Sequence, residues 1–414
     1  VELFEISQTA YNIYFQDVQF GSTSDVSGDP AGYEQGSDLT SNLIGCSIKT
    51  PSSEIPFVHN VTFSNCYFRN LYQAINTSHF VTGVYLNQCI SGRTKIKSFD
   101  FIGSNIVMNA CSHSFAFDTK VGTSLATDSI VNFGRTTGLS EKFSMNFCDL
   151  RYNSYLDNTN GVPNRSSGSI YAKNARYVFV CSSILDKGSN YIDDCFSVRF
   201  DKNIINSEGL AYGLVINAPC SDITVVNNCF NVNQYNTIIG SAILDAGAID
   251  FGGTSGLINK VKVINNNFVV RDNIRYNKSI LDFTAPTGIS LLNIEFVNNL
   301  CVENASLIVS KWISIDNVSG QFSNFACNVW PLRQSDMGFA FVGGSLRDWS
   351  YWSQSGIDSD SQQIDVLISD MLIVYRNKLL LSIYPRLQDN QYFHPAASRD
   401  FNDEVRDYSH TGTG

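Results

Sequence analysis

The chain has 414 residues, of which 16% are charged and 43% hydrophobic, and its formal net charge is −10 with a pI near 5.0. This acidic balance argues against binding to nucleic acid or to an anionic membrane surface, because both need a positive field on the protein. No uninterrupted apolar run approaches the roughly 20 residues that span a bilayer, so we expect no membrane insertion.

A strand motif, apolar–any–apolar followed by a polar turn and another apolar residue, recurs along most of the chain. Its copies read IYFQDVQF from Ile13, VTFSNCYF from Val61, VYLNQCI from Val84, FDFIGSNI from Phe99, FSMNFCDL from Phe143, YVFVCSSI from Tyr177, FSVRFDKNI from Phe196, ITVVNNCF from Ile223, VKVINNNFVV from Val261, IEFVNNLC from Ile294, ISIDNVSGQF from Ile313 and FAFVGGSL from Phe339. A fixed motif at variable spacing predicts constant strands joined by loops of different length. The sequence therefore predicts an all-β, right-handed parallel β-helix, a solenoid whose coils stack about 4.8 Å apart.

Asparagine follows the strand in several copies, where strands normally exclude it. In a coiled backbone this residue suits the corner, because it tolerates the left-handed conformation and its amide can bond to an asparagine in the next coil. We expect Asn65, Asn227, Asn265 and Asn298 to hold corners and to have no catalytic role.

A second, shorter strand alternates with the first, and several copies carry an acid near the end. They include SIYAKN from Ser169, YIDDCF from Tyr191, YGLVIN from Tyr212, AIDFGG from Ala248 and ILDFTA from Ile280. The acids in this position are Asp118, Asp157, Asp193 with Asp194, Asp250 and Asp282, and the first catalytic candidates are Asp193, Asp194, Asp250 and Asp282. Stacked like charges raise one another's pKa, so a fold has little structural reason to align them. Glycoside hydrolysis needs such a pair, one carboxyl as general acid and the other as base or nucleophile.

Coil spacing gives this pairing a geometry. Asp250 and Asp282 on adjacent coils would be about 5 Å apart, which suits retention, while Asp194 and Asp250 would lie two coils apart, roughly 9 to 10 Å, near the upper limit for inversion. Asp245 and Glu208 are further catalytic candidates. The opposing interpretation is that the acids are solvated corner residues or pair with lysines, namely Lys173, Lys202 and Lys311.

Aromatic side chains on the shorter strands would give a sugar its stacking platforms. The candidates for substrate binding are Tyr171, Tyr191, Tyr212, Trp312 and the cationic Arg199. Two other functions stay open: a polysaccharide lyase, which needs a base such as Tyr171, Lys173 or Arg199 near cations that neutralise a uronate, and a non-cleaving adhesin. The five histidines lack metal-ligand spacing, and we expect neither a metal nor a cofactor.

The rhythm of the motif weakens after about residue 330. We predict a β-helical body with a glycan-binding groove over residues 1–335, and an associated C-terminal β region over residues 336–414 that forms a terminal coil or an oligomerisation segment. Eleven cysteines are scattered without a CxxC pair, and Cys66, Cys89, Cys148, Cys181 and Cys229 sit just inside the strands. We expect these to be buried fillers, which implies assembly in a reducing compartment.

The segment IDDCFSV, followed by SEGLAYGLVI, resembles the DDC and glycine-rich segments of the polygalacturonase family, although Tyr212 stands where that family carries histidine. As a whole the chain resembles the β-helical body of a bacteriophage tailspike that depolymerises capsule or O-antigen. This resemblance implies a homotrimer on the virion tail, assembled in the host cytoplasm and acting on polysaccharide at the bacterial cell surface. It also implies carboxylate pairs, sometimes at a subunit boundary.

Overall fold

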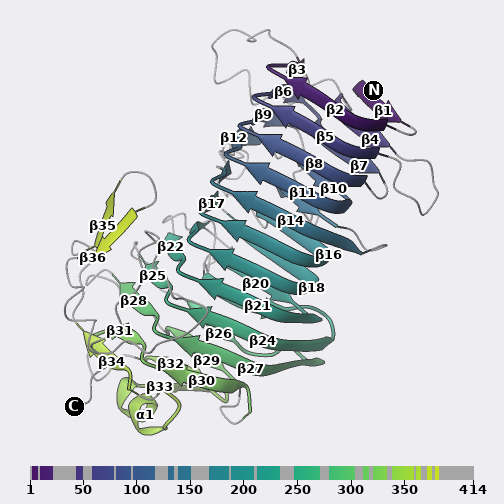
Figure 1. The fold of residues 1–414 in the computed structure, drawn as a ribbon. Helices are drawn as coiled ribbons and strands as arrows, with labels where there is room; N and C mark the ends of the chain where they lie inside the picture. Colours follow the sequence, from purple (N-terminus) through teal and green to yellow (C-terminus); the bar gives the residue numbers. More distant parts are fainter. Residues whose placement is uncertain are drawn as a thin grey trace, which may run out of the picture. The chain divides into compact units, whose positions relative to one another are not determined.

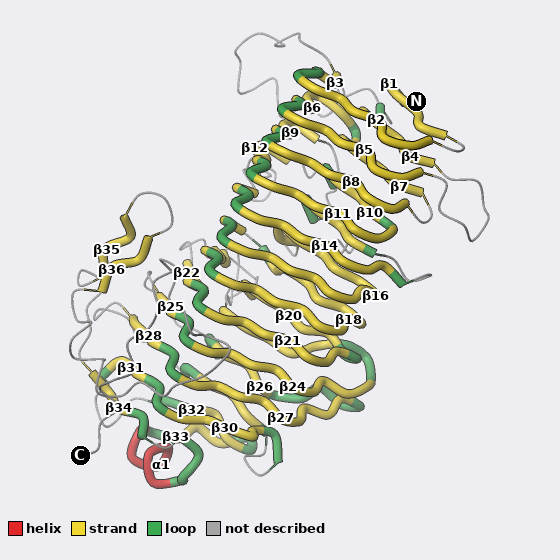
Figure 2. The backbone as a smooth tube through the Cα atoms, viewed as in Figure 1, coloured by secondary structure: helices red, strands yellow, loops and turns green. Residues whose placement is uncertain are grey.

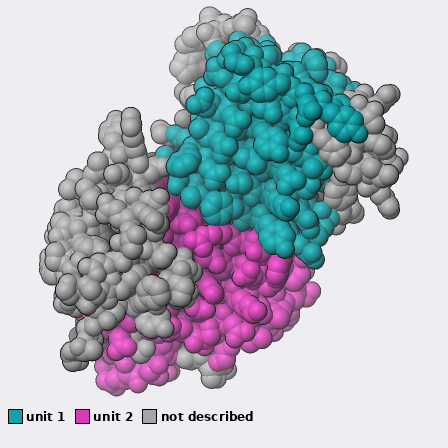
Figure 3. Space-filling model, in the orientation of Figure 1, with its two compact units in different colours: residues 1–191 teal, residues 192–414 magenta. Residues whose placement is uncertain are grey.

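The computed structural model describes part of the chain, and every structural statement concerns that part. The described residues are 2–7, 10–21, 43–49, 58–78, 81–94, 97–116, 129–134, 139–150, 167–185, 188–208, 212–233, 247–270, 279–303, 311–316, 320–332, 338–358, 360–364, 371–374 and 378–381. They belong to two units, Val1–Tyr191 (unit 1) and Ile192–Gly414 (unit 2), which Figure 3 shows in different colours.

Unit 1 consists of three columns of parallel strands (Figure 1). The first column contains β1 (Glu2–Ser7), β4 (Ile44–Lys49), β7 (Gln73–Ser78), β10 (Phe99–Phe101), β13 (Val131–Phe133) and the start of β16 (Ser167–Cys181). The second contains β2 (Ala10–Gln16), β5 (Val58–Ser64), β8 (Val81–Asn87), β11 (Gly103–Asn109), β14 (Ser140–Asn146) and the end of β16. The third contains β3 (Gln19–Gly21), β6 (Tyr67–Leu71), β9 (Ile90–Thr94), β12 (Ser112–Ala116), β15 (Asp149–Leu150) and β17 (Ile184–Leu185).

Unit 2 repeats this arrangement. Its first column contains the start of β18 (Ser189–Asp201), then β20 (Tyr212–Asn217), β23 (Gly247–Gly252), β26 (Leu281–Phe283), β29 (Ile313–Ile315) and β32 (Ala340–Val342). Its second contains the end of β18, then β21 (Cys220–Val226), β24 (Gly256–Ile264), β27 (Ile289–Val297) and β30 (Phe322–Ala326). Its third contains β19 (Ile204–Glu208), β22 (Cys229–Asn233), β25 (Asn267–Val270), β28 (Leu300–Glu303), β31 (Val329–Pro331) and β34 (Gln362–Ile364). The predicted all-β parallel β-helix is confirmed.

The parallel coil continues beyond residue 335, because β32 and β34 pair with the preceding coil. Next to β32 the chain adds an antiparallel strand, β33 (Ser345–Arg347), and a short helix, α1 (Trp349–Gln354). An antiparallel hairpin of β35 (Met371–Val374) and β36 (Lys378–Leu381) follows. The predicted division at residue 335 stays a prediction. No helix in the described ranges is long and apolar enough to cross a bilayer.

The two strand classes of the sequence correspond to two columns of the structure. Copies of the longer motif form the second column, and the shorter strand forms the first. Three copies were placed in the wrong class: the strands at Phe99, Ile313 and Phe339 lie in the first column or lead into it. The reason is that FDF, ISI and FAF are apolar–any–apolar triplets, which fit either class.

The core of each unit is a set of inward-facing rows, one residue from each coil. In the first column of unit 1 the row Cys46, Ile75, Phe99, Val131 and Ile170 is fully buried. In unit 2 Phe230 stacks on Phe268 in the third column with ring centroids 5.0 Å apart, and Phe296 stacks on Phe325 in the second column at 4.9 Å. Each coil therefore buries its apolar face against its two neighbours rather than in a central core of its own.

The corners explain the asparagines (Figure 2 shows these turns in green between the strands). Asn65, Asn227, Asn265 and Asn298 have φ values of 51°, 58°, 55° and 57°, so the predicted left-handed corners are confirmed. The left-handed residue turns the chain between the second and third columns, and asparagine adopts this conformation at lower cost than most residues.

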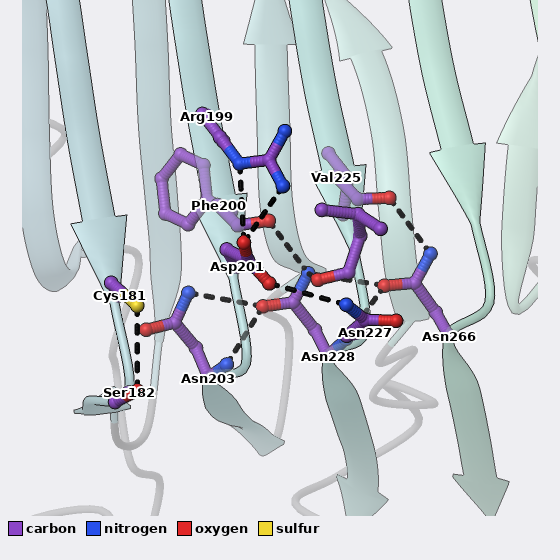
Figure 4. A network of polar contacts seen from close by, with 11 residues as sticks. Cys181, Ser182, Arg199, Phe200, Asp201, Asn203, Val225, Asn227, Asn228 and Asn266 are labelled. Carbon is purple, nitrogen blue, oxygen red and sulfur yellow. Dashed lines mark hydrogen bonds and ion pairs between the residues drawn. The ribbon is translucent and has the colours of Figure 1, made fainter. Parts of the chain in front are cut away.

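The asparagine ladder, however, is formed by the next residue along the chain. In unit 2 it consists of Asn203, Asn228, Asn266, Asn299 and Asn328, all buried. Each of the first four donates its side-chain Nδ2 to the Oδ1 of the following one, at 3.0 to 3.1 Å. The backbone N–H of the first four donates to the same oxygen at 2.9 Å. Figure 4 shows the rungs from Asn203 to Asn266.

In unit 1 the residue after this left-handed corner is cysteine in four of the described coils, and Val18 and Ser183 take the position in the other two. Cys66, Cys89, Cys111 and Cys148 each follow a left-handed residue, are buried and are free. Each thiol donates to two backbone carbonyls; for Cys89 these are those of Phe63, at 3.4 Å, and Asn87, at 3.6 Å. Contact with the Cys111 thiol and burial raise the pKa of Cys89, which keeps it protonated and able to donate. The cysteines are fillers, as predicted for Cys66, Cys89 and Cys148, and also weak donors. The predicted burial is confirmed for Cys229 and is wrong for Cys181, which is half-buried.

Asp358 ends the asparagine ladder. Its Oδ1 accepts hydrogen bonds from Asn328 Nδ2, at 3.1 Å, and from the Ser361 hydroxyl. Its Oδ2 accepts from the indole Nε1 atoms of Trp330, at 2.7 Å, and Trp352, at 3.0 Å. Burial raises the pKa of Asp358 to about 6, while these four donors act in the opposite direction. An ionisable group therefore caps the last rung of unit 2.

Candidate active site

Two acids face outward from neighbouring strands of the first column of unit 2. In β23 the side chains of Ile249 and Phe251 enter the core, so Asp250 between them points out; in β26 Asp282 does the same between buried neighbours. The register pairs Asp250 directly with Asp282. Both side chains are half-buried. The predicted placement of these two aspartates on adjacent coils is confirmed.

Local hydrogen bonds orient Asp282. Its Oδ1 accepts from the backbone N–H of Thr284, at 3.1 Å, and from the Thr284 hydroxyl, at 2.5 Å. One coil further the outward residue is Ser314, which is buried. Nearby, Asp316 Oδ2 accepts from the backbone N–H of Ala285 at 2.7 Å and fixes the turn after β26. The turn thus holds one oxygen of Asp282 and leaves the other oxygen free of these bonds.

Asp193 and Asp194 differ in their environments. Asp193 is half-buried in β18, and β20 lies between β18 and β23, so Asp193 is two coils from Asp250. Asp194 is exposed and has a φ of 53°, which makes it a corner residue. The corner interpretation that the sequence left open therefore describes the backbone of Asp194, while its catalytic role stays a prediction.

The remaining acidic candidates lie elsewhere. Glu208 ends β19 in the third column, so its strand is not one of those that carry Asp250 and Asp282. Asp118, Asp157 and Asp245 lie outside the described residues. Among the lysines, Lys202 is a corner residue with a φ of 59°, and the Nζ of Lys311 lies 4.5 Å from the ring centroid of Phe341.

Two of the proposed sugar platforms are buried. Trp312 is 0% exposed and donates its Nε1 to Glu303 Oε2 at 3.0 Å; Tyr212 is 4% exposed and donates its hydroxyl to the Ser279 carbonyl at 3.3 Å. Neither ring is available to stack on a sugar in this structure. The physical reason is that both stand at the entry of a first-column strand, where the chain turns into the core.

The other binding candidates are more accessible. In unit 1 Tyr171 and Tyr191 are half-buried and meet edge to face, with ring centroids 5.9 Å apart. Arg199 lies in the second column of unit 2 and is in register with Thr224. It forms an ion pair with Asp201, with Nη2 and Oδ2 2.8 Å apart (Figure 4). Arg199 is therefore on a different face of the coil from Asp250 and Asp282.

Sequence reasoning missed one acid of the same kind. Asp100 is the outward residue of β10 in unit 1, in register with Asn76 and Asn132. It is 2% exposed and pairs with Lys97 at 2.8 Å. The signal was present, because FDF at Phe99–Phe101 repeats the pattern of IDF and LDF in β23 and β26. Its ion pair and its burial make Asp100 a structural residue of unit 1.

Within the described ranges, no group of three or more His, Cys, Asp or Glu side chains is arranged to hold a metal ion. Asp250 and Asp282 present two outward carboxyl groups one coil apart, and a turn orients that of Asp282. This arrangement is suited to proton transfer and nucleophilic attack on one bond.

Comparison with protein-family models found no match, and comparison with curated proteins found none. Among solved structures the chain is similar to a DFA-IIIase from Arthrobacter chlorophenolicus A6 without its lid, with a TM-score of 0.46 and 13% identity, covering 83% of this chain and 88% of that one. It is also similar to a mannuronic acid specific polysaccharide family 6 lyase enzyme from human gut microbiota, with a TM-score of 0.37 and 10% identity, covering 88% and 85%. The function proposed below rests on this chain's own residues.

Proposed function

We propose that the protein cleaves bacterial surface polysaccharide, capsule or O-antigen, as an endo-acting glycoside hydrolase with Asp250 and Asp282 as its carboxylate pair. The observation that carries the proposal is the direct register of these two outward aspartates. Residues paired in this way on neighbouring strands are about 5 Å apart at the backbone, and a retaining mechanism needs carboxyl groups about 5 to 5.5 Å apart, so two parallel outward side chains are compatible with it.

In this mechanism Asp282 is the nucleophile and Asp250 the general acid. The hydrogen bonds from Thr284 hold one oxygen of Asp282, and its other oxygen attacks the anomeric carbon. Asp250 protonates the leaving glycosidic oxygen as that bond breaks. Water then hydrolyses the glycosyl–Asp282 ester, with Asp250 now taking the proton of the water, so that the net reaction adds one water across the bond.

The fuller proposal is a bacteriophage tailspike: a homotrimer on the virion tail that is assembled in the host cytoplasm and acts at the bacterial surface. The chain's irregular parallel coils with asparagine corners support it, as do its free, buried cysteines, which suit assembly in a reducing compartment. Sedimentation of the purified protein as three copies would agree with this form, and a stable monomer would contradict it.

Substitution of the pair tests the mechanism. We expect Asp250→Asn and Asp282→Asn each to lower the rate at which new reducing ends appear on capsular or O-antigen polysaccharide by at least about a hundredfold. Asp222→Asn is the matched control, because Asp222 is a half-buried corner residue of the same unit with a φ of 59°. If both variants of the pair retain the wild-type rate, the assignment fails.

The products separate this reaction from its alternatives. Hydrolysis gives reducing ends without the ultraviolet absorbance of an unsaturated uronate, whereas that absorbance would indicate a lyase, and binding without cleavage an adhesin. We expect the first-formed product to keep its anomeric configuration. Inversion would instead favour a pair two coils apart, such as Asp193 and Asp250.

A further inference from the structure

The outer face of the second column in unit 1 carries a continuous row of uncharged, partly aromatic side chains, here called the aromatic row. Strand register places one residue per coil in it: Tyr14, Thr62, Tyr85, Val107, Ser144 and Phe179. Tyr14 is 59% exposed and the others are half-buried. The row lies on a different column from the one whose outward residues include Asp250 and Asp282 in unit 2.

A second row, the amide row, runs parallel to it two residues further along each strand. Its central members are Asn87, Asn109 and Asn146. Asn109 donates its Nδ2 to Asn87 Oδ1 at 3.2 Å, and Asn146 donates to Asn109 Oδ1 at 3.1 Å. Asn146 also donates to the Ser144 hydroxyl at 3.0 Å, which joins the two rows. An amide has two donor hydrogens and two acceptor lone pairs, so these bonds leave Asn109 one of each for a ligand hydroxyl.

Charge distinguishes this face from the corresponding face of unit 2. Neither row contains a charged residue in the described coils of unit 1, although the chain has a formal charge of −10. The aromatic row's counterpart in unit 2 includes Arg199, Lys262 and Glu295, with Lys262 and Glu295 paired at 3.8 Å. In place of the amides unit 2 has Val226 and Ile264, both fully buried.

We propose that this face of unit 1 binds a neutral glycan chain without cleaving it. Pyranose rings present C–H faces that pack on aromatic rings, and their hydroxyls need donors and acceptors such as free amide valences. The rows repeat once per coil, about every 4.8 Å, which is close to the length of one sugar residue in an extended chain. A repeating ligand can therefore meet the same pair of rows several times.

The absence of charge in the two rows selects the ligand. A uronate or sialate would leave its carboxylate without a cationic partner here, so the glycan is uncharged where it lies on the face. The inference takes only its ligand class from the proposed function, and it requires no chemistry at Asp250 or Asp282.

Binding by a non-cleaving variant tests the inference. The probe is an array of purified neutral and acidic O-antigen and capsular polysaccharides, and the background is Asp282→Asn, so that cleavage does not remove the ligand. We expect at least one neutral polysaccharide to bind, and Tyr85→Ala and Asn109→Ala each to weaken that binding on the order of tenfold. Thr224→Ala is the matched control, because Thr224 holds the corresponding outward position in unit 2, and we expect it to leave binding unchanged.

Three results would overturn the inference. The first is that the protein binds only acidic polysaccharides or none. The second is that binding of a neutral polysaccharide survives both substitutions. The third is a change of sedimentation coefficient in Tyr85→Ala, which would assign the face to contact between copies of the chain. The two proposals fail separately. If Tyr85→Ala loses binding of neutral polysaccharide but the wild type cleaves no polysaccharide, only the hydrolase proposal is refuted. If the wild type cleaves polysaccharide but substitution of Tyr85 and Asn109 leaves binding unchanged, only the proposal for this face is refuted.

Discussion

The two units form the same turn with different inward side chains. After the left-handed corner residue unit 1 places cysteine, as at Cys89 and Cys111, and unit 2 places asparagine, as at Asn228 and Asn266. Both types donate to the carbonyl two residues back and to a carbonyl of the preceding coil. Asparagine also accepts, from the side-chain amide and backbone N–H of the preceding rung, and so its side chains bond to one another from coil to coil. A small inward donor therefore suits this corner, although Val18 after Asp17 shows that it is not required, and within the described residues the ladder is specific to unit 2.

Removal of one rung from each unit gives the largest expected difference. Asn266 makes bonds to both neighbouring rungs and to the carbonyls of Val225 and Ile264. Asn266→Ala leaves these buried groups without hydrogen-bond partners, and we expect it to lower the free energy of unfolding by about 3 to 5 kcal/mol. Cys89→Ala removes weak thiol hydrogen bonds and leaves a small cavity, and we expect it to lower the free energy of unfolding by about 1 to 2 kcal/mol. Urea unfolding of both variants measures the difference; equal losses would mean that the ladder adds nothing to the corner.

The acid at the end of the ladder makes unit 2 sensitive to pH in a way that the cysteine corners of unit 1 are not. The folded pKa of Asp358, about 6, lies above its ordinary value of 3.8. Between these values the folded chain binds the proton and the unfolded chain does not, so this group's contribution to stability rises as pH falls from 7 towards 4, by about 2 to 3 kcal/mol in total.

Asp358→Asn removes that titration and isolates it from the other carboxyl groups. We expect the difference in unfolding free energy between wild type and Asp358→Asn to grow in favour of the wild type as pH falls through 6. Urea unfolding at several pH values measures it. A difference that stays constant, or that shrinks on acidification, would show that the four hydrogen-bond donors outweigh the effect of burial at Asp358.

The fold was predictable because its strands and corners are local properties. Strand alternation and the tolerance of asparagine for positive φ are properties of short segments, and they located Asn265 and the aspartates of IDF and LDF correctly. The ladder was assigned one residue too early, since the run Asn265–Asn267 does not reveal which amide faces inward. That depends on the left-handed corner, which interrupts the alternation of the strand and turns Asn266 into the core.

The site was less predictable because it depends on which coils are neighbours. Loops of variable length separate the copies, so the spacing of the motif did not assign Asp100 to the column class of Asp250, although FDF repeats the pattern of IDF and LDF. Nor could alternation show that Trp312 turns inward, because it precedes its strand and its environment is set by Glu303 on another column. Register between distant segments, which the structure supplies, decides both cases.

Exposed side chains on the outer surfaces contribute least to the difference in stability between the two units. Arg199 in unit 2 forms its ion pair with Asp201 at the surface, with 36% of the arginine side chain exposed. Arg199→Ala should lower the free energy of unfolding by no more than about 1 kcal/mol, and by less at high salt, because solvent and counterions screen exposed ion pairs. The uncharged Thr62 of unit 1 is the matched site, and the loss caused by Thr62→Ala should not depend on salt. Urea unfolding at low and high sodium chloride measures both, and a salt-independent loss at Arg199 would show that its packing, rather than its charge, stabilises unit 2.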